Sequence, residues 1–310
     1  IFLIFCIILR LASSKLPNII IYHEEKHYYD PINDKIMFFP SLTQTAIPEV
    51  YLSVIVPAYN EEQRLPLMLE DALNYLKIRS DRDDRFSYEI IIVDDGSRDK
   101  TAKIGLKYAK ELGTDKVRVL TLKKNRGKGG AVRLGMLFAR GALILFADAD
   151  GATKFEDFEK LEKFMIDNRD SIPPAIAIGS RAHLEKESIA SRSLIRTILM
   201  YGFHLIVWLL TVRTIRDTQC GFKLFGREIA KVIFTHIHVE RWAFDVELLL
   251  IAEHLQCKIG EIPVNWKEIE GSKIIPFWSW IQMGKDVVLI FLKYTIGAWS
   301  LPKLNKGNKV

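Results

Sequence analysis

The first half of the chain alternates short apolar runs with polar turns and with longer stretches of helical spacing. Each run is short enough for a strand and is continuously apolar, as in strands that are buried on both faces of a parallel sheet. A strand, a turn and a helix that repeat in this order predict parallel strands joined by right-handed crossovers, hence an α/β fold. The expected strands are 52–56, 88–93, 117–122, 142–147 and 175–178.

Two of the expected helices are preceded by residues that are spaced as capping boxes. Asn60 with Gln63 predicts a helix that continues through Tyr75, and Thr153 with Glu156 predicts another that ends near residue 168. The remaining helices of the expected domain end at residue 109 or lie at 131–139 and 246–255.

Two carboxylates follow the strand at 142–147. Asp148 and Asp150 lie where that strand ends, and ligands of an open α/β sheet bind at the carboxyl ends of its strands. Alternate side chains of an extended segment share a face, so both carboxylates can reach one divalent cation. A cation held by one or two carboxylates keeps positions open for phosphate oxygens. An isolated Asp-x-Asp also occurs in solvated turns, and the polar turns at the other strand ends favour the metal site.

The other polar turns point to an anionic ligand. The strand at 88–93 leads into Asp94 and Asp95. Lys128 lies in a glycine-rich loop close to a helix start, where backbone N–H groups and an ammonium suit anionic groups. This loop has neither the Gly-x-Gly-x-x-Gly spacing of dinucleotide sites nor the Gly-Lys-Ser/Thr ending of P-loops, so it matches neither motif.

The composition fits one large globular domain with anionic partners. The 310 residues carry 44 basic and 38 acidic side chains, a formal net charge of +6. This balance suits anionic partners such as phospholipids, and it is also typical of a solvated Lys-rich surface. The basic residues are dispersed and no recognition motif is present, so no nucleic acid is expected as a partner. Cys6, Cys220 and Cys257 lack disulfide or zinc spacing, as in a reducing compartment.

Four motifs occur in order over about half of the chain. They are Val-Pro-Ala-Tyr-Asn-Glu at 56–61, Val-Asp-Asp-Gly-Ser at 93–97, Gly-Lys-Gly at 127–129 and Asp-Ala-Asp-Gly at 148–151. In this order they resemble glycosyltransferase family 2, which implies a glycosyltransferase-A (Rossmann-like) fold with a mostly parallel central sheet flanked by helices. From residue 52 almost to the C-terminus, the chain also resembles the eukaryotic dolichyl-phosphate β-glucosyltransferases, through Gly179-Ser180-Arg181, Gln219-Cys220-Gly221-Phe222-Lys223 and the segment 241–247.

The resemblance implies roles for single residues. Asp148 and Asp150 would hold Mg²⁺ or Mn²⁺, which stabilises a leaving diphosphate. Asp95 would contact the uracil ring of the donor. The full set of expected donor residues is Pro57, Tyr59, Glu61, Asp94, Asp95, Lys128 and Asp148. The expected acceptor residues are Arg181, Arg192 and Arg241, and the expected catalytic residues are Asp150, Arg181, Asp245 and Lys223.

Two of these residues have a second interpretation. Asp245 falls where family 2 enzymes often carry a catalytic-base carboxylate, but a lipid phosphate is already ionised at neutral pH and needs little help from a base. We therefore assign Asp245 to a sugar hydroxyl or to the acceptor, and the alternative is that it caps the helix at 246–255. Arg181 would hold the acceptor phosphate because guanidinium forks match phosphate oxygens, or it is a surface contact.

The ends of the chain indicate contact with a membrane. Residues 1–9 are wholly apolar but rise only ~14 Å as a helix, whereas a span needs ~20 residues, so we interpret 1–15 as a truncated N-terminal transmembrane segment. Arg10 and Lys15 then place the rest of the chain in the cytosol by the positive-inside rule. The expected divisions that follow are an irregular linker at 16–50, the glycosyltransferase catalytic domain at 51–270 and C-terminal membrane-interface helices at 271–310.

A second apolar segment, residues 198–210, is too short to span a membrane comfortably. Either it is a buried core helix or it lies at the membrane interface. Arg192, Arg196 and Arg213 bracket it and favour the interface, as does the mixture of aromatic and basic residues in the tail.

The expected reaction is an inverting transfer of glucose from UDP-glucose to dolichyl phosphate at the endoplasmic reticulum membrane, for protein N-glycosylation. One alternative is a dolichyl-phosphate mannosyltransferase that uses GDP-mannose, because neither carboxylate motif reports which sugar is bound. The other is a non-catalytic protein that binds nucleotide sugars or lipid phosphates. The sequence does not indicate the oligomeric state, the polyprenol length or the identity of the divalent ion.

Overall fold

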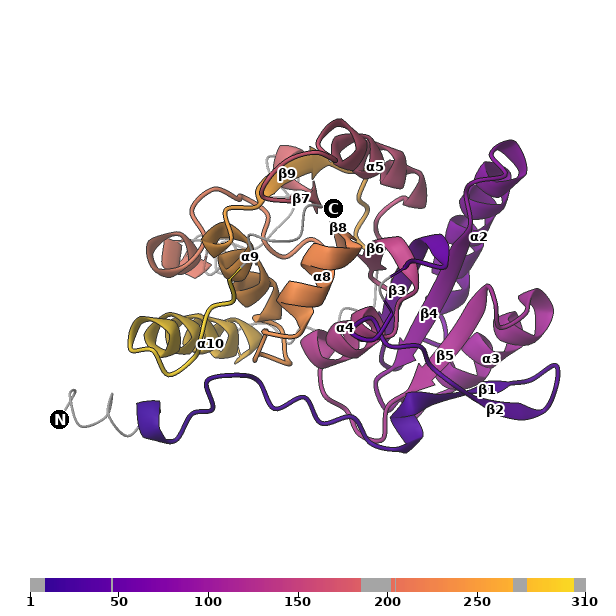
Figure 1. Cartoon of the computed structure of the whole chain (residues 1–310), viewed down its shortest axis with the longest axis horizontal. Helices are drawn as coiled ribbons and strands as arrows, with labels where there is room; N and C mark the ends of the chain where they lie inside the picture. Colours follow the sequence, from indigo (N-terminus) through magenta and orange to yellow (C-terminus); the bar gives the residue numbers. More distant parts are fainter. Residues whose placement is uncertain (1–8, 46, 185–201, 204, 270–277, 304–310) are drawn as a thin grey trace.

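The computed structural model describes residues 9–45, 47–184, 202–203, 205–269 and 278–303. Seven strands form its central sheet: β3 (Val50–Ala58), β4 (Tyr88–Asp94), β5 (Val117–Thr121), β6 (Gly141–Ala147), β7 (Ala175–Ser180), β8 (Phe222–Gly226) and β9 (Lys258–Pro263). Their order is β5-β4-β3-β6-β8-β7-β9 (Figure 1). Only β8 runs antiparallel to its neighbours in this described sheet. The mostly parallel sheet and all five expected strands are therefore confirmed.

Helices cover both faces of the sheet. They are α2 (Leu65–Arg82), α3 (Thr101–Leu112), α4 (Lys128–Leu137), α5 (Phe158–Asp167), α8 (Arg227–Phe234), α9 (Phe244–His254) and α10 (Trp278–Thr295). Successive side chains of a strand point to opposite faces, so Ile90 and Ile91 of β4 belong to different apolar cores. Ile90 packs in the core formed with α2, α3 and α5, and Ile91 packs in the core formed with α4, α8, α9 and α10.

Both predicted capping boxes are wrong. The helix after β3 begins at Leu65, where Pro66 suits a first turn that needs no N–H partner. Asn60 instead has a positive φ of 54°, and its Oδ1 accepts a hydrogen bond from the Arg98 N–H, which ties two strand-end turns together. Thr153 forms an isolated β-bridge with Trp266, and α5 begins only at Phe158, after the 3-10 helix η2 (Phe155–Asp157).

The expected irregular linker contains a β-hairpin, which corrects that part of the prediction. Its strands are β1 (His27–Asp30) and β2 (Lys35–Phe38), paired antiparallel. The turn forms because the Asp30 carboxylate accepts the N–H groups of Ile32 and Asn33. The 3-10 helix η1 (Glu24–Lys26) precedes the hairpin. The pattern was missed because β2 is exposed along its whole length and therefore has no apolar alternation to detect.

The apolar segment near residue 205 is partly buried in the core and partly exposed. Its described part is helical at 202–203 and 205–210. Phe203 and Val207 belong to the core, whereas Leu205, Trp208 and Leu209 are each more than half exposed. No helix among the described residues is both long enough and apolar enough to cross a membrane. Residues 1–8 of the expected N-terminal transmembrane segment (1–15) and Arg192 lie outside the described residues.

Candidate active site

A cavity of about 970 Å³ lies at the carboxyl ends of β3, β4 and β6. Its walls carry Ala58 from the end of β3, Asp95 from the turn after β4 and Asp148 from the turn after β6. Phe203 and Val207 also line it. The position agrees with the rule that open α/β sheets bind ligands outside the carboxyl ends of their strands. A cavity of this volume matches a ligand the size of a nucleotide sugar.

Asp95 is held rigidly at one side of this cavity. Its Oδ1 accepts the Arg126 N–H at 2.7 Å, and its Oδ2 accepts the Gly127 N–H at 2.8 Å. Gly127 has a φ of 86°, which a residue with a side chain rarely adopts. Burial raises the pKa of Asp95 to about 7, although the two backbone N–H groups oppose that shift. The carboxylate therefore has a fixed orientation and titrates near neutral pH.

The other expected donor residues divide into two groups. Pro57, Tyr59 and Glu61 line the cavity, whereas Asp94 does not. Asp94 closes its own turn instead, because its Oδ1 accepts the Ser97 N–H at 3.2 Å. Glu61 also has a local partner, because its carboxylate accepts hydrogen bonds from Nε and Nη2 of Arg64 at 2.6 and 2.5 Å.

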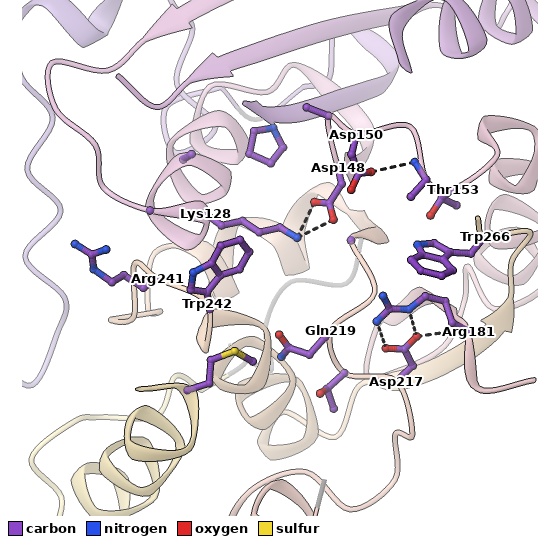
Figure 2. A pocket seen from close by; sticks show the side chains of 18 of the residues that line it. Lys128, Asp148, Asp150, Thr153, Arg181, Asp217, Gln219, Arg241, Trp242 and Trp266 are labelled. Carbon is purple, nitrogen blue, oxygen red and sulfur yellow. Dashed lines mark hydrogen bonds and ion pairs between the residues drawn. The ribbon is translucent and has the colours of Figure 1, made fainter. Parts of the chain in front are cut away.

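Asp148 and Asp150 both line the cavity, beside Lys128 (Figure 2). The Lys128 Nζ lies 2.6 Å from Oδ1 and 2.9 Å from Oδ2 of Asp148. Burial disfavours the ammonium, but the charges of Asp148 and Asp245 outweigh it and raise the pKa of Lys128. Burial and the neighbouring Asp148 charge raise the pKa of Asp150. The two neighbouring carboxylates repel each other, and a bound cation would relieve that repulsion.

The donor set fits Mg²⁺ or Mn²⁺. Within the described part of the chain no group of three or more His, Cys, Asp and Glu side chains is arranged for a metal, so Asp148 and Asp150 would supply only two protein ligands. Mg²⁺ is commonly bound in this way, with phosphate oxygens and waters completing its shell. Gly221 makes room for Asp148, because a Cβ there would collide with the Asp148 carboxylate. The Gly221 carbonyl also accepts the Asp148 N–H at 3.0 Å.

Arg181 lies across the cavity from Lys128 (Figure 2). Its Nε and Nη2 bind the two oxygens of Asp217 at 2.7 and 2.8 Å, and the guanidinium lies 5.4 Å from the ring centre of Trp266. Burial raises the pKa of Asp217, but Arg181 outweighs burial and lowers it to about 2. Two nitrogens of the expected phosphate-binding fork are thus used by Asp217, which leaves Nη1 to reach a ligand without breaking the pair.

Lys223 and Asp245 are buried, and neither lines the cavity. The Lys223 Nζ lies 2.6 Å from Asp245 Oδ1 and donates to the Cys220 carbonyl at 2.6 Å. Asp245 does not cap α9, so that alternative is wrong: the N-cap is Ala243, and it forms no side-chain cap. The buried pair instead fastens the turn that carries Gly221 against Asp148.

Arg241 lies at the cavity edge on the side opposite Arg181, and its guanidinium points away from Asp148 (Figure 2). Of the three expected acceptor arginines, the structure therefore does not bring Arg181 and Arg241 together, and Arg192 lies outside the described residues. Sequence reasoning also missed several residues that line the cavity, among them Arg64, Asp217 and Trp266. For Arg64 a local signal exists, because Glu61, its ion-pair partner, lies three positions before it in the turn that leads into α2.

The comparisons with known proteins identify the family. The model of Glycosyl transferase family 2 matches residues 53–234. The chain is 57% identical over 302 residues to dolichyl-phosphate beta-glucosyltransferase of Homo sapiens, covering 96% of this chain and 91% of that protein. It is 47% identical over 261 residues to the Saccharomyces cerevisiae protein of the same name, covering 81% of this chain and 77% of that protein.

Solved structures support the fold. Glucosyl-3-phosphoglycerate synthase from Mycobacterium tuberculosis, in complex with UDP, has a TM-score of 0.54 at 16% identity, covering 84% of this chain and 83% of that chain. Its complex with Mn²⁺, UDP-glucose and phosphoglyceric acid has a TM-score of 0.53 at 15% identity, covering 84% and 82%. This likeness confirms the glycosyltransferase-A fold. The chain belongs to glycosyltransferase family 2 and, within it, to the dolichyl-phosphate β-glucosyltransferases.

Proposed function

We propose that this protein transfers glucose from UDP-glucose to dolichyl phosphate with inversion, giving dolichyl β-D-glucosyl phosphate. One observation carries the proposal: a single cavity holds the fixed Asp95 carboxylate, the Asp148 and Asp150 pair, and Arg181 on the far side. This arrangement offers one place for a nucleoside, one for a diphosphate and one for a second phosphate. The relatives named above support the choice of glucose and dolichyl phosphate.

On the donor side, Asp95 accepts the N3–H of uracil, because both its oxygens are already oriented by backbone N–H groups. Tyr59 and Pro57 line the same region. Asp148 and Asp150 would hold Mg²⁺ or Mn²⁺, which would supply Lewis acidity to stabilise the leaving diphosphate. Crystal complexes of the M. tuberculosis synthase contain UDP with Mn²⁺ or Mg²⁺, which supports this assignment. Lys128 moves its ammonium from Asp148 to the diphosphate as negative charge develops there.

On the acceptor side, the phosphate monoester is ionised at neutral pH, since its second pKa lies near ~6, so its oxygen attacks the anomeric carbon without a general base. Arg181 orients this phosphate through Nη1 while Asp217 holds the guanidinium plane. Lys223 and Asp245 are positioning residues that support the turn under Asp148. A one-step displacement inverts α-linked glucose to the β-linked product.

The lipid part of the acceptor requires an apolar approach. Phe203, Val207 and Trp208 line the cavity from the helical segment near residue 205. The same segment exposes Leu205, Trp208 and Leu209, whose apolar surface suits a bilayer. We propose that the protein acts at the endoplasmic reticulum membrane with the catalytic domain on the cytosolic side. The proposed lipid acceptor supports the membrane location, and Arg10 and Lys15 after the apolar N-terminal run support the cytosolic side.

A panel of radiolabelled nucleotide sugars offered with dolichyl phosphate tests the function. UDP-glucose should be the preferred donor, and the lipid product should carry a β linkage by NMR. Preferential use of GDP-mannose would reassign the protein as a mannosyltransferase. Binding of UDP-glucose without lipid product under every metal condition would favour a non-catalytic binding protein.

A further inference from the structure

The N-terminal segment (residues 15–26) precedes the expected catalytic domain in the sequence. It nevertheless contacts the loop that follows β5 within that domain. Glu25 is fully buried in η1, and its Oε1 accepts the Lys123 N–H at 3.0 Å. Its Oε2 lies 2.6 Å from Nη2 of Arg126. The second terminal nitrogen of Arg126 donates to the Ile20 carbonyl at 2.6 Å. The guanidinium of Arg126 is thus enclosed by the N-terminal segment.

The backbone of the same arginine belongs to the donor site. The Arg126 N–H is one of the two groups that hold Asp95, and Gly127 supplies the other. A continuous series of contacts therefore runs from Glu25 through Arg126 to Asp95. The ring of Tyr22 adds to it, with its centre 5.3 Å from the Arg126 guanidinium and 5.0 Å from the Lys123 ammonium.

Attaching a linker through a buried ion pair costs desolvation free energy for both charges. The side chains of Glu25 and Arg126 are 0% and 3% exposed, so both charges are removed from water. Apolar contacts usually stabilise such a junction as well or better, whereas charged groups impose a defined geometry. The geometry here fixes the direction of two backbone N–H groups at the edge of the cavity.

We propose that Glu25 is a positioning residue of the donor site. It acts through Arg126 to hold the 126–127 backbone on Asp95, and thereby keeps the Asp95 carboxylate oriented for the pyrimidine base. This inference rests on the proposed uridine-nucleotide donor. It extends the functional site beyond the region matched by the family model, which begins at residue 53.

The test is Glu25→Gln in the full chain, which keeps the side-chain shape and a carbonyl acceptor but removes the charge. The probe is uridine, because it lacks phosphates and does not depend on the metal pair. Its dissociation constant should rise by roughly tenfold. The KM for UDP-glucose should rise with it, while kcat and the KM for dolichyl phosphate change little.

The matched control is Glu162→Gln. Glu162 is also buried and ion-paired, with Arg79 at 3.0 Å, but it joins α5 to α2 and does not line the cavity. This variant should lower the unfolding temperature without changing uridine affinity. In a double-mutant cycle, Arg126→Gln should weaken uridine binding on its own and add little in the Glu25→Gln background. Equal uridine affinity of the Glu25→Gln and unaltered proteins, or an equal loss in the control, overturns the proposal.

Amide hydrogen exchange separates this proposal from the proposed function. The Arg126 and Gly127 amides should exchange faster in Glu25→Gln than in Glu162→Gln, without any ligand present. If uridine fails to bind the unaltered protein, the donor assignment falls, and the exchange rates still decide whether Glu25 positions the loop. Unchanged exchange at both amides refutes the positioning role.

Discussion

The ammonium of Lys128, at the first residue of α4, lies within 2.9 Å of both carboxylate oxygens of Asp148, directly after β6. The lysine therefore occupies the position from which a divalent cation would approach the same carboxylate. Two cations that share one carboxylate repel each other, so Lys128 would compete with a divalent ion in the protein without donor. A bound diphosphate would offer negative charge to both cations.

Lys128→Met should change metal affinity and turnover in opposite directions. Removing the ammonium frees Asp148, so Mn²⁺ should bind the protein without donor about tenfold more tightly. Turnover should fall by about 100-fold, because the leaving diphosphate loses one of its cations. Calorimetry with Mn²⁺ and a steady-state assay measure the two quantities. Asp148→Asn should lose both Mn²⁺ affinity and turnover. Lys124→Met, in the exposed part of the same loop, should change neither quantity.

Gly221→Ala should abolish metal binding while the fold is retained. An added Cβ collides with the Asp148 carboxylate and turns it away from Asp150. A displacement of about 1 Å at a reacting site costs about 100-fold in rate. Gly226→Ala, five residues along the chain, is the control, because its Cβ would have no heavy atom within 4 Å. Normal Mn²⁺ titration of Gly221→Ala would disprove this role of Gly221.

Uridine binding should strengthen as the pH rises through about 7. Burial raises the pKa of Asp95 to about 7, and in the proposed role the ionised carboxylate is the stronger acceptor for the uracil N3–H. Affinity should therefore be about tenfold weaker at about pH 6 than at about pH 8.

Folding stability should follow the opposite trend, because the pKa of Asp95 is raised in the folded state. The stabilisation from protonated Asp95 is fully present below the pKa that Asp95 has in the unfolded chain. It is lost as the pH rises through the folded-state pKa of about 7. Asp95→Asn should remove both pH dependences. A flat uridine affinity across this range in the unaltered protein would contradict the assignment.

Arg181→Gln should impair acceptor use far more than donor binding. The loss of a charge-assisted contact to the lipid phosphate costs about 1.5 to 3 kcal/mol, so the KM for dolichyl phosphate should rise at least about tenfold. Part of that effect could come from leaving the buried Asp217 unpaired. Asp217→Asn separates the two effects. It removes the negative charge beside Arg181 but keeps an amide oxygen for its guanidinium, so this variant should still use dolichyl phosphate. Equal effects of Arg181→Gln on UDP affinity and on acceptor KM would argue against the role.

The segment near residue 205 should contribute to membrane binding. Replacing Leu205, Trp208 and Leu209 by Ser removes apolar side chains that are each more than half exposed, so co-sedimentation with anionic vesicles should fall severalfold without loss of stability. Ile36→Ser with Phe38→Ser on β2 is the control, because these side chains are equally apolar and more exposed. A similar loss in both variants would show that the effect is not specific to this segment.

The sequence by itself determined the parallel strands and the location of the carboxylate pair, Asp148 and Asp150. Both depend on local properties: β4 is continuously apolar because it is buried on both faces, and Asp148 with Asp150 directly follows a strand. Carboxyl ends of parallel strands meet at one edge of a sheet, so the turns after β3, β4 and β6 had to converge. Helix starts were less accurate, because the side chains of Asn60 and Thr153 found partners in other turns rather than in their own helices.

Only the tertiary structure decided which charges pair around the cavity. The partners of Lys223, Arg181 and Arg126 lie 22, 36 and 101 positions away in the chain. No periodicity links residues at such distances, since each contact requires the sheet to be assembled first. Lys223 pairs with Asp245 beneath the site, Arg181 pairs with Asp217, and Glu25 of the expected linker pairs with Arg126 in the loop after β5. These pairs form because a charge removed from water is stable only beside a partner, and the folded chain determines which partner is within reach.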